Sequence, residues 1–458
     1  MSAPNLLPQV DFDYCVVTDA DYKRHPIPAY AGHPFIECLE QYVDFDELAN
    51  AIEQRPDFAE EQRTWPTVYR GQLAHGLDRL FLALPRTIVV VRTFIDLMME
   101  GYVGREPFNA RHHELLNADD RKEPEMAVLA KVKAERAVAF IGVPGTGKSK
   151  TVEHFHALYS KPRYHVLYGI WQIPVLIIRF PPDGRSVHSL ATELIEAIDA
   201  KLPHVGYAEM FLRRGSLNAW ERLRHARRLL LLHAVGLIFV EESQDTKYST
   251  SPKPQNSDKL RDIKTEVESP VLSHLIAASN TFGVPLVFMG TNELGDILKS
   301  RLSRGRRAAG LPRWKELARS GNLKEPGEFE LLLISMWEFQ WLEAYVPLTQ
   351  VIADEFAALT QCNPDVVVKL FKTCQRRAIL ENRKDFDVAF IRSTFEEYFE
   401  LVAEALEDIA SNDPDALALR PELAPPELRP SRPDFEKVKA RMHEQNMREG
   451  RTRRRSAP

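Results

Sequence analysis

The residues best suited to chemistry lie at positions 142–149 and fit the phosphate-binding pattern G-x-x-x-x-G-K-[ST]. They are Gly142, Val143, Pro144, Gly145, Thr146, Gly147, Lys148 and Ser149. The glycines let the backbone curl, so that several N–H groups can face one phosphate. We expect Lys148 to reach the β- and γ-phosphates and the Ser149 hydroxyl to bind Mg²⁺, with Lys150 beside them. The pattern therefore predicts a site for ATP and Mg²⁺.

Two acids follow a second apolar run, Leu237-Ile-Phe-Val240. A strand that ends in carboxylates delivers them to the phosphate edge of a parallel sheet. We expect Glu241 to help hold Mg²⁺ and Glu242 to polarise the attacking water. Aspartate is the usual first acid, and the extra methylene of Glu241 moves the carboxylate, which bears on metal geometry and hydrolysis rate. The alternative is a buried strand that ends at a charged surface.

A third apolar run, Val284–Met289, leads into Thr291 and Asn292. A polar side chain at such a strand end can hydrogen-bond the water or the γ-phosphate. Arg306 and Arg307 belong to a nearby cluster of arginines. In an oligomeric ATPase such an arginine reaches the γ-phosphate of the next subunit. A basic surface turn is the equally open alternative.

The loop Gly101-Tyr102-Val103-Gly104-Arg105 carries two glycines beside an aromatic residue. It suits either a loop that approaches a nucleotide base or a simple linker turn. The basic stretch at 213–228 is open to two interpretations, a solvated surface or a DNA-facing surface. The polar segment at 246–270 indicates a flexible loop, which either meets a phosphate backbone or is only a disordered insertion.

These residues must be positioned by an α/β core. Short apolar runs at 137–141, 174–178, 237–240 and 284–289 predict buried strands, and apolar residues at helical spacing predict a helix over 189–202. We expect a small, mostly helical N-terminal domain at 1–115, a P-loop core at 116–320 and a helical lid at 321–410, where Asn363 caps a helix before Pro364. The tail 411–458 is rich in Pro and Arg, which predicts disorder.

Composition narrows the class of protein. The chain has 458 residues, of which 44% are hydrophobic and 27% charged, as in soluble globular proteins. A net charge of −5 gives no global attraction to nucleic acid, so any DNA contact needs a local basic face. The four cysteines form no C-x-x-C pair, which favours reduced thiols without zinc. No signal peptide or membrane span is evident, so we expect a cytoplasmic protein.

The order of these elements is that of an AAA+ ATPase, and several segments resemble TnsC, the AAA+ regulator of heteromeric cut-and-paste transposons. The resembling segments are His33–Glu37, Gly101–Pro107, Glu241–Gln244, Gly290-Thr291, Arg306–Gly310 and Val366–Phe371. The resemblance runs from about residue 22 to residue 400, and Gly101–Pro107 and Val366–Phe371 are its most specific parts. The tail is not covered.

The resemblance implies site roles. Lys148 and Ser149 hold phosphate and Mg²⁺, Glu241 takes the place of the family's Asp, and Glu242 is the catalytic acid. Thr291 or Asn292 is the sensor, and Arg306 or Arg307 is the arginine that acts in trans. Tyr102, Val103 and Arg105 line the adenine pocket. Asp365 stands where many lids have an arginine, and Lys369 is a substitute for it.

The resemblance also implies a function: ATP-dependent assembly, as a ring or filament, on double-stranded DNA. Such an assembly links a target-selector protein to the transposase and is reset by ATP hydrolysis. Three alternatives stay open. They are another DNA-associated AAA+ ATPase, such as a replication initiator or helicase loader, a nucleotide-switched signalling scaffold without DNA, and a protein that binds ATP without hydrolysing it.

Overall fold

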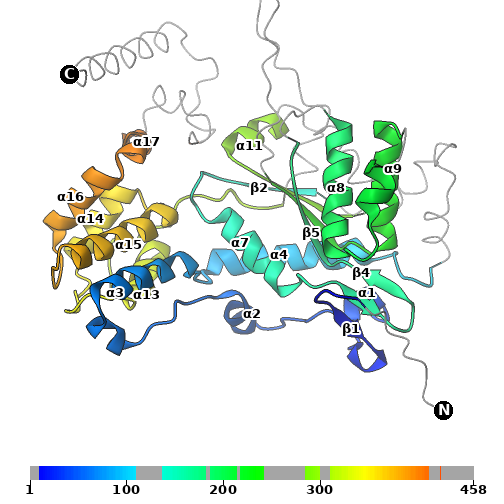
Figure 1. Cartoon of the computed structure of the whole chain (residues 1–458), viewed down its shortest axis with the longest axis horizontal. Helices are drawn as coiled ribbons and strands as arrows, with labels where there is room; N and C mark the ends of the chain where they lie inside the picture. Colours follow the sequence, from blue (N-terminus) through cyan, green and yellow to red (C-terminus); the bar gives the residue numbers. More distant parts are fainter. Residues whose placement is uncertain are drawn as a thin grey trace, which may run out of the picture.

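The computed structural model describes residues 10–109, 137–181, 186–213, 217–241, 284–299, 310–411 and Leu423. Glu242, Arg306 and Arg307 lie outside the described residues, as does nearly all of the tail. The described elements form an α/β core beside a helical lid (Figure 1).

A four-stranded parallel sheet is the centre of the core. Its strands are β2 (Ala137–Ile141), β5 (Val175–Arg179), β6 (Leu237–Glu241) and β7 (Leu286–Gly290), in the order β2-β7-β6-β5. The register pairs Ala137 with Leu286 and Ile141 with Gly290. All neighbouring pairs are parallel, so the carboxyl ends of the strands meet at one edge. The four predicted strands are confirmed.

Alternate residues of these strands enter two separate cores, as strand geometry requires. Ala139 and Phe288 pack with α8 (Val187–Lys201) and α9 (Ala219–Leu232) on one face. Phe140, Phe239 and their neighbours pack with α4 (Pro85–Tyr102) and α7 (Lys148–Leu158) on the other. The sheet is therefore covered on both faces (Figure 1), as the predicted fold class requires. No helix in the described ranges has the length and apolarity that crossing a bilayer needs.

The apolar side chains of the described N-terminal residues, 10–109, are divided between the core beneath the sheet and the core of the lid, and the domain at 1–115 stays a prediction. Phe35 of α1 (Pro34–Glu37) and Leu48 of α2 (Phe45–Ile52) are buried against the sheet side. Leu77 of η3 (Ala74–Arg79) is instead buried in the lid core, next to α3 (Thr67–Leu73). The segment is shared between core and lid because its apolar side chains are spread over short elements, each too small to bury them alone.

The remaining elements are short. β1 (Cys15–Val17) pairs in parallel with β3 (Arg163–His165), which pairs antiparallel with β4 (Ile170–Gln172). The N-terminal strand β1 thus joins a small sheet with the two strands that follow α7. Single turns occur at η1 (Asp19–Asp21), η2 (Glu60–Thr64) and η4 (Glu209–Arg213).

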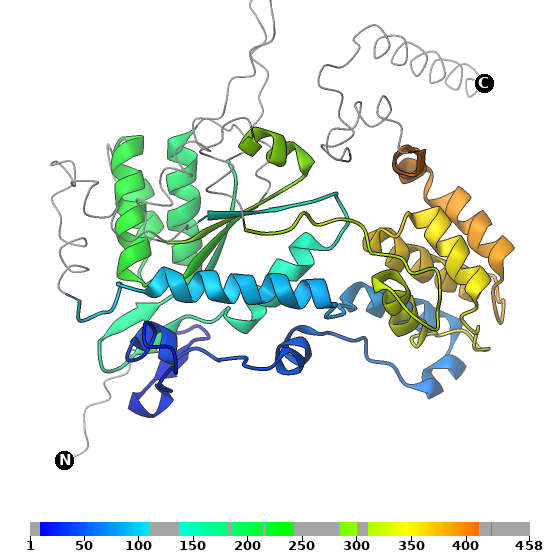
Figure 2. The ribbon, with the colours of Figure 1, turned by 180° about the vertical axis from the view of Figure 1, so that it is seen from behind.

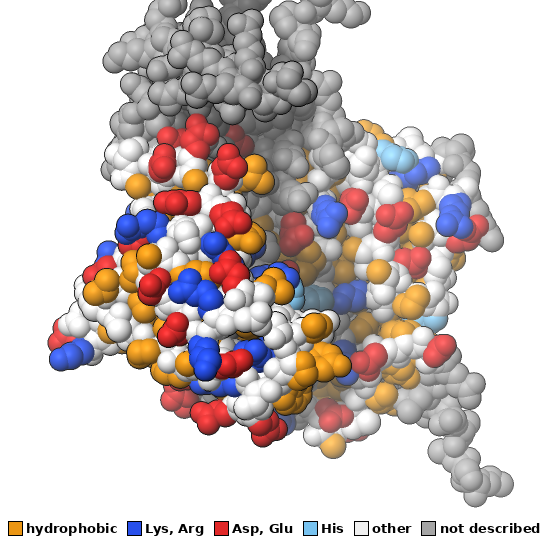
Figure 3. Space-filling view, turned by 60° about the vertical axis from the view of Figure 1, so that its left-hand side comes forward, with side chains coloured by type: hydrophobic (Ala, Val, Ile, Leu, Met, Phe, Trp, Pro, Cys, Tyr) orange, Lys and Arg blue, Asp and Glu red, His pale blue; other side chains and the backbone are white. Residues whose placement is uncertain are grey.

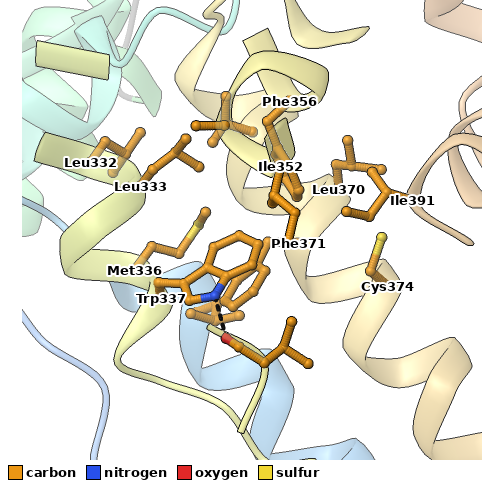
Figure 4. Close-up of a cluster of buried hydrophobic side chains, with 14 of the residues drawn as sticks. Leu332, Leu333, Met336, Trp337, Ile352, Phe356, Leu370, Phe371, Cys374 and Ile391 are labelled. Carbon is orange, nitrogen blue, oxygen red and sulfur yellow. Dashed lines mark hydrogen bonds between the residues drawn. The ribbon is translucent and has the colours of Figure 1, made fainter. Parts of the chain in front are cut away.

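The lid is an all-helical unit. Its helices are α13 (Glu328–Trp337), α14 (Gln350–Thr360), α15 (Pro364–Leu380), α16 (Val388–Tyr398) and α17 (Glu400–Ser411). At its centre Trp337 stacks on Phe371 with ring centroids 4.5 Å apart, and its indole N–H donates to the Val346 carbonyl at 2.7 Å (Figure 4). The Asn363 side chain accepts a hydrogen bond from the Asp365 N–H, which confirms the predicted cap.

Phe94 tests the core beneath the sheet. It is fully buried, with ring centroids 5.0 Å from Phe239 and 5.4 Å from Phe155. Truncation to alanine leaves a cavity, so Phe94→Ala is expected to lower the free energy of unfolding by about 3 to 5 kcal/mol. Val89 lies on the same helix and is 53% exposed. Val89→Ala is the control and should unfold close to wild type in urea, whereas equal losses would contradict this packing.

Candidate nucleotide-binding site

The P-loop joins β2 to α7 at the carboxyl edge of the sheet, as predicted. Gly145 and Gly147 have φ angles of +78° and +94°, a backbone conformation that residues other than glycine rarely adopt. A β-carbon on Gly145 would also lie 2.7 Å from the Asn363 side chain. The helix begins at Lys148, so its first N–H groups face the loop. Such a turn is a ready site for an anion.

Lys148 folds back over the loop. Its Nζ donates to the carbonyl oxygens of Gly142 at 2.9 Å and Val143 at 2.8 Å. The Thr146 hydroxyl donates to the same Val143 carbonyl at 2.6 Å. Burial lowers the pKa of Lys148 to about 8, because desolvation disfavours the ammonium form. A phosphate would supply the negative charge that this ammonium group needs.

The P-loop opens into a cavity of about 560 Å³, within the range of small-molecule sites. Its walls come from five parts of the chain, one of which is the segment with Trp314 and Leu317 that leads into the lid. The P-loop side contributes residues 144–151, the strand ends contribute Glu241 and residues 289–291, and the lid contributes Pro364, Asp365, Val368 and Lys369. The remaining wall is Asp78, Leu80, Phe81, Leu82, Leu84, Arg86 and Thr87. Figure 3 shows one face of the molecule, hollowed between the lid and the core.

The strand ends bring polar groups to this cavity. Glu241 ends β6 and Thr291 follows β7, and both line the wall. The Thr291 hydroxyl is buried and has no hydrogen-bond partner among the described residues. Asn292 begins α11 (Asn292–Lys299) and is 1% exposed, but it does not line the cavity. Of the two predicted sensor residues, Thr291 is thus the one whose side chain is placed to meet a ligand.

Trp314 connects the P-loop to the segment that leads into the lid. Its N–H donates to the Ile141 carbonyl at 2.8 Å, and its indole N–H donates to the Thr146 carbonyl at 2.7 Å. Gly142 must be glycine here, because an added β-carbon would lie 2.0 Å from the Trp314 carbonyl oxygen. The Arg86 guanidinium lies over the indole at 4.3 Å. Sequence reasoning missed Trp314 because no local pattern marks it.

The lid touches the P-loop directly. The Asn363 side chain donates to the Pro144 carbonyl at 2.9 Å, and the Asp365 N–H donates to the Gly145 carbonyl at 3.2 Å. One turn along α15, Lys369 forms an ion pair with Asp365 at 2.6 Å. Both side chains line the cavity, so the predicted substitution of lysine for the usual lid arginine is placed where it could meet phosphate.

The wall formed by residues 78–87 was also missed. One hydrogen bond and one ion pair hold it in place: Lys150 donates to the Asp78 carbonyl at 2.6 Å, and Lys372 of the lid pairs with the Asp78 carboxylate at 2.6 Å. Leu80, Phe81 and Leu82 present an apolar surface to the cavity. In sequence this stretch looks like one more apolar helix, and only its position beside the P-loop shows that it forms a wall of the cavity.

The structure does not bring the predicted base-binding loop at 101–105 to the cavity, because the loop lies at the opposite edge of the sheet. Tyr102 is fully buried, and its hydroxyl donates to the Ala234 carbonyl at 3.1 Å. Arg105 donates to the Val235 carbonyl at 2.7 Å. Both carbonyls lie just before β6, whereas the P-loop lies beyond the carboxyl ends. Tyr102, Val103 and Arg105 therefore do not line the cavity.

Helix α4 explains the separation. Its first turn supplies Arg86 and Thr87 to the cavity, and it ends at Tyr102. At 1.5 Å per residue the 16 steps from Arg86 to Tyr102 span about 24 Å. Figure 2 shows α4 running from the lid side of the core to its far side. The N-terminal end of this helix, and not the glycine loop after it, faces the nucleotide cavity.

A known protein family matches the part of the chain that forms most of this site. Residues 131–298 match the family model described as an AAA domain. The chain contains an α/β core of the AAA+ type. No curated protein matches it. Two solved structures are distantly similar to this chain. The Walker-type ATPase PABY2304 of Pyrococcus abyssi is 14% identical, with 67% of this chain and 83% of that chain covered and a TM-score of 0.36. Cdc6p from Pyrobaculum aerophilum is 15% identical, with 67% and 76% covered and a TM-score of 0.38.

Trp314→Phe tests the connection between the P-loop of this AAA+ core and the lid. Phenylalanine keeps the ring over Arg86 but loses the indole donor, which leaves the Thr146 carbonyl without that bond. We expect ATP-analogue affinity to fall by about fivefold, equivalent to about 1 kcal/mol. Titration with a fluorescent analogue measures it. Trp65 is 42% exposed, and Trp65→Phe is the matched control that should bind like wild type. Unchanged affinity in Trp314→Phe would contradict a role for this hydrogen bond.

The pKa of Lys148 predicts a pH dependence of nucleotide binding. Phosphate stabilises the ammonium form, so the complex holds a proton that the free protein loses above a pKa of about 8. Affinity should therefore be constant below that pH and fall as pH rises through 8 and 9, by up to about tenfold per unit. Calorimetry measures the affinity at each pH. In Lys148→Ala the affinity should be low and should not change with pH. A wild-type affinity that does not change between pH 7 and 9.5 would contradict this assignment.

Proposed function

We propose that this AAA+ core binds ATP with Mg²⁺ in the cavity and hydrolyses the bond between the β- and γ-phosphates. The observation that supports this most is that three polar side chains from distant parts of the chain meet at one cavity. Lys148 begins the helix after β2, Glu241 ends β6 and Thr291 follows β7, and the three residues line one cavity that the lid also borders. A stabilising cation, a carboxylate and a neutral hydrogen-bond donor are the groups that phosphoryl transfer to water uses.

Each group then has a role. Lys148 leaves the Gly142 and Val143 carbonyls and reaches the β- and γ-phosphates. Ser149 and Glu241 would hold Mg²⁺, since oxygen donors suit this ion, and the ion when bound would neutralise phosphate charge. Thr291 positions the γ-phosphate or the water. Glu242, outside the described residues, is proposed to orient the attacking water because it directly follows Glu241.

The nucleotide base is proposed to lie against the apolar wall at Leu80, Phe81 and Leu82. These residues and the P-loop border the same cavity, and Asp78 holds the wall against α7 by a hydrogen bond and against α15 by an ion pair. The lid then meets the phosphates through Lys369, which would exchange its ion pair with Asp365 for a phosphate oxygen. Binding in this way engages the core, the lid and the N-terminal segment together.

The finer proposal is a regulator of DNA transposition. Its support is the resemblance of Gly101–Pro107, Val366–Phe371 and other segments to TnsC. In this role the ATP-bound protein assembles as a ring or filament on duplex DNA, with Arg306 or Arg307 reaching the next subunit's nucleotide. The assembly recruits the transposase to a site chosen by a target-selector protein, and hydrolysis resets it. Contacts to the phosphate backbone would give little sequence preference.

The net negative charge of the chain restricts the surfaces to which DNA could bind. The chain carries a net charge of −5, and on the face in Figure 3 acidic and basic side chains are mixed. Binding would therefore depend on a local basic surface and would weaken with salt, as counterion release requires. A salt titration of DNA binding belongs with the test of this role.

The deciding experiment measures assembly size and DNA binding of the full chain with ATP, a non-hydrolysable analogue or ADP, together with phosphate release. ATP and the analogue should drive large assemblies on duplex DNA, ADP should not, and Lys148→Ala should fail with each nucleotide. Lys161 pairs with Asp13 on the surface at 2.8 Å, and Lys161→Ala is the matched control.

Other outcomes select the alternatives. Nucleotide binding without any DNA-dependent assembly contradicts the transposition role and favours a signalling scaffold. Preference for one DNA sequence favours a replication initiator. Assembly on DNA without phosphate release contradicts the proposed hydrolysis and indicates a protein that only binds ATP.

A further inference from the structure

A residue from beyond the lid is seated beside the P-loop. Leu423 is 9% exposed and packs against Val143, with Ala405 and Ile409 of α17 completing the cluster. We name the surface formed by Val143, Asn292, Ala405 and Ile409 the tail seat. It joins three parts of the molecule, since Val143 belongs to the P-loop, Asn292 follows β7, and the other two residues belong to the last lid helix.

The tail seat also holds Leu423 by a polar contact. The Asn292 amide nitrogen donates to the Leu423 carbonyl at 3.2 Å in a buried setting. The amide oxygen is buried too and has no partner among the described residues. Leaving one end of the buried Asn292 amide unpaired costs free energy. The hydrogen bond at its other end depends on Leu423.

The two residues that hold Leu423, Val143 and Asn292, are each next to a group of the phosphate site. The Val143 carbonyl accepts from Lys148 at 2.8 Å and from the Thr146 hydroxyl at 2.6 Å. Asn292 directly follows Thr291, which lines the cavity. When Lys148 leaves the Val143 carbonyl for a phosphate, the loop loses a bond that holds it in the shape that seats Leu423. The binding of Leu423 and the binding of nucleotide therefore both depend on the arrangement of Val143 and Lys148.

We propose that Leu423 is an intramolecular ligand of the tail seat and that its seating lowers ATP turnover. This inference rests on the proposed ATPase function. Seated, Leu423 holds the Asn292 amide away from the cavity and keeps Val143 and Lys148 in their nucleotide-free arrangement. ATP and the seated Leu423 disfavour each other, and by linkage removal of Leu423 strengthens ATP binding by the factor with which ATP releases it.

The occupant is this chain's own Leu423 for two reasons. Leu423 is already seated, and α17, which supplies half of the seat, ends at Ser411, only 12 residues before it. A short connection keeps the local concentration of Leu423 high, so even a weak contact is occupied. Any partner that captured the tail would then release the site.

The test compares two truncations of the full chain, 1–411, which removes Leu423, and 1–429, which keeps it. Steady-state phosphate release should rise by roughly fivefold or more in 1–411 and stay at the wild-type level in 1–429. A synthetic peptide of residues 418–428 added to 1–411 should restore low turnover. Equal turnover of the two truncations, or no effect of the peptide, would overturn the proposal.

Point variants separate this contact from general damage. Leu423→Asp should reproduce the effect of 1–411, because a carboxylate cannot stay in the apolar cluster. Leu401, on α17, is 98% exposed, so Leu401→Asp is the matched control and should behave like wild type. The same increase in both variants would show a nonspecific effect of charge and contradict the proposal.

A second measurement keeps the inference testable if no variant hydrolyses ATP. Absence of phosphate release from the full chain and from 1–411 would overturn the ATPase proposal alone. Binding of a fluorescent ATP analogue then decides about the tail. The Kd should be lower for 1–411 than for 1–429, by roughly fivefold. An equal Kd for the two truncations would overturn the inference while leaving nucleotide binding intact.

Discussion

The in-register parallel pairing of β2 with β7 is the constraint on which the rest of the structure depends. Ile141 pairs with Gly290, so the P-loop and Thr291 leave the sheet side by side at the same edge. A shift by one residue would turn every side chain to the other face and exchange two cores with different partners. The apolar strands are buried on both faces, and this burial holds the register that brings a cation and a hydroxyl to one cavity.

The two halves of the molecule are joined by shared parts and not by one linker. The N-terminal segment contributes to the sheet core and to the lid core, and its middle forms a wall of the cavity. Trp314 and Asn363 tie the P-loop carbonyls to the segment entering the lid and to the lid itself. Because buried carbonyls must keep their hydrogen-bond partners, movement of the lid has to be matched by a change in the loop.

Motifs and the spacing of apolar residues were enough to predict the strands, the P-loop, the acidic end of β6 and the cap at Asn363. They did not decide where Tyr102, Val103 and Arg105 lie. Two glycines beside an aromatic fit a ligand loop and a buried turn equally, and the hydrogen bonds that decide between them reach Ala234 and Val235, 130 residues or more away in sequence. The length of α4 then sets which of its two ends lies at the cavity.

The sequence by itself determined which residues form the phosphate loop and which strands carry it, because those signals are local: spacing of glycines, runs of apolar residues and the acids that end a run. Only the tertiary structure decided which distant segments close the site. Residues 78–87, Trp314 and the lid helix α15 reach the cavity through the crossing of parallel strands and through packing on two faces of one sheet. Such contacts join positions far apart in the chain, where no local pattern records that they meet.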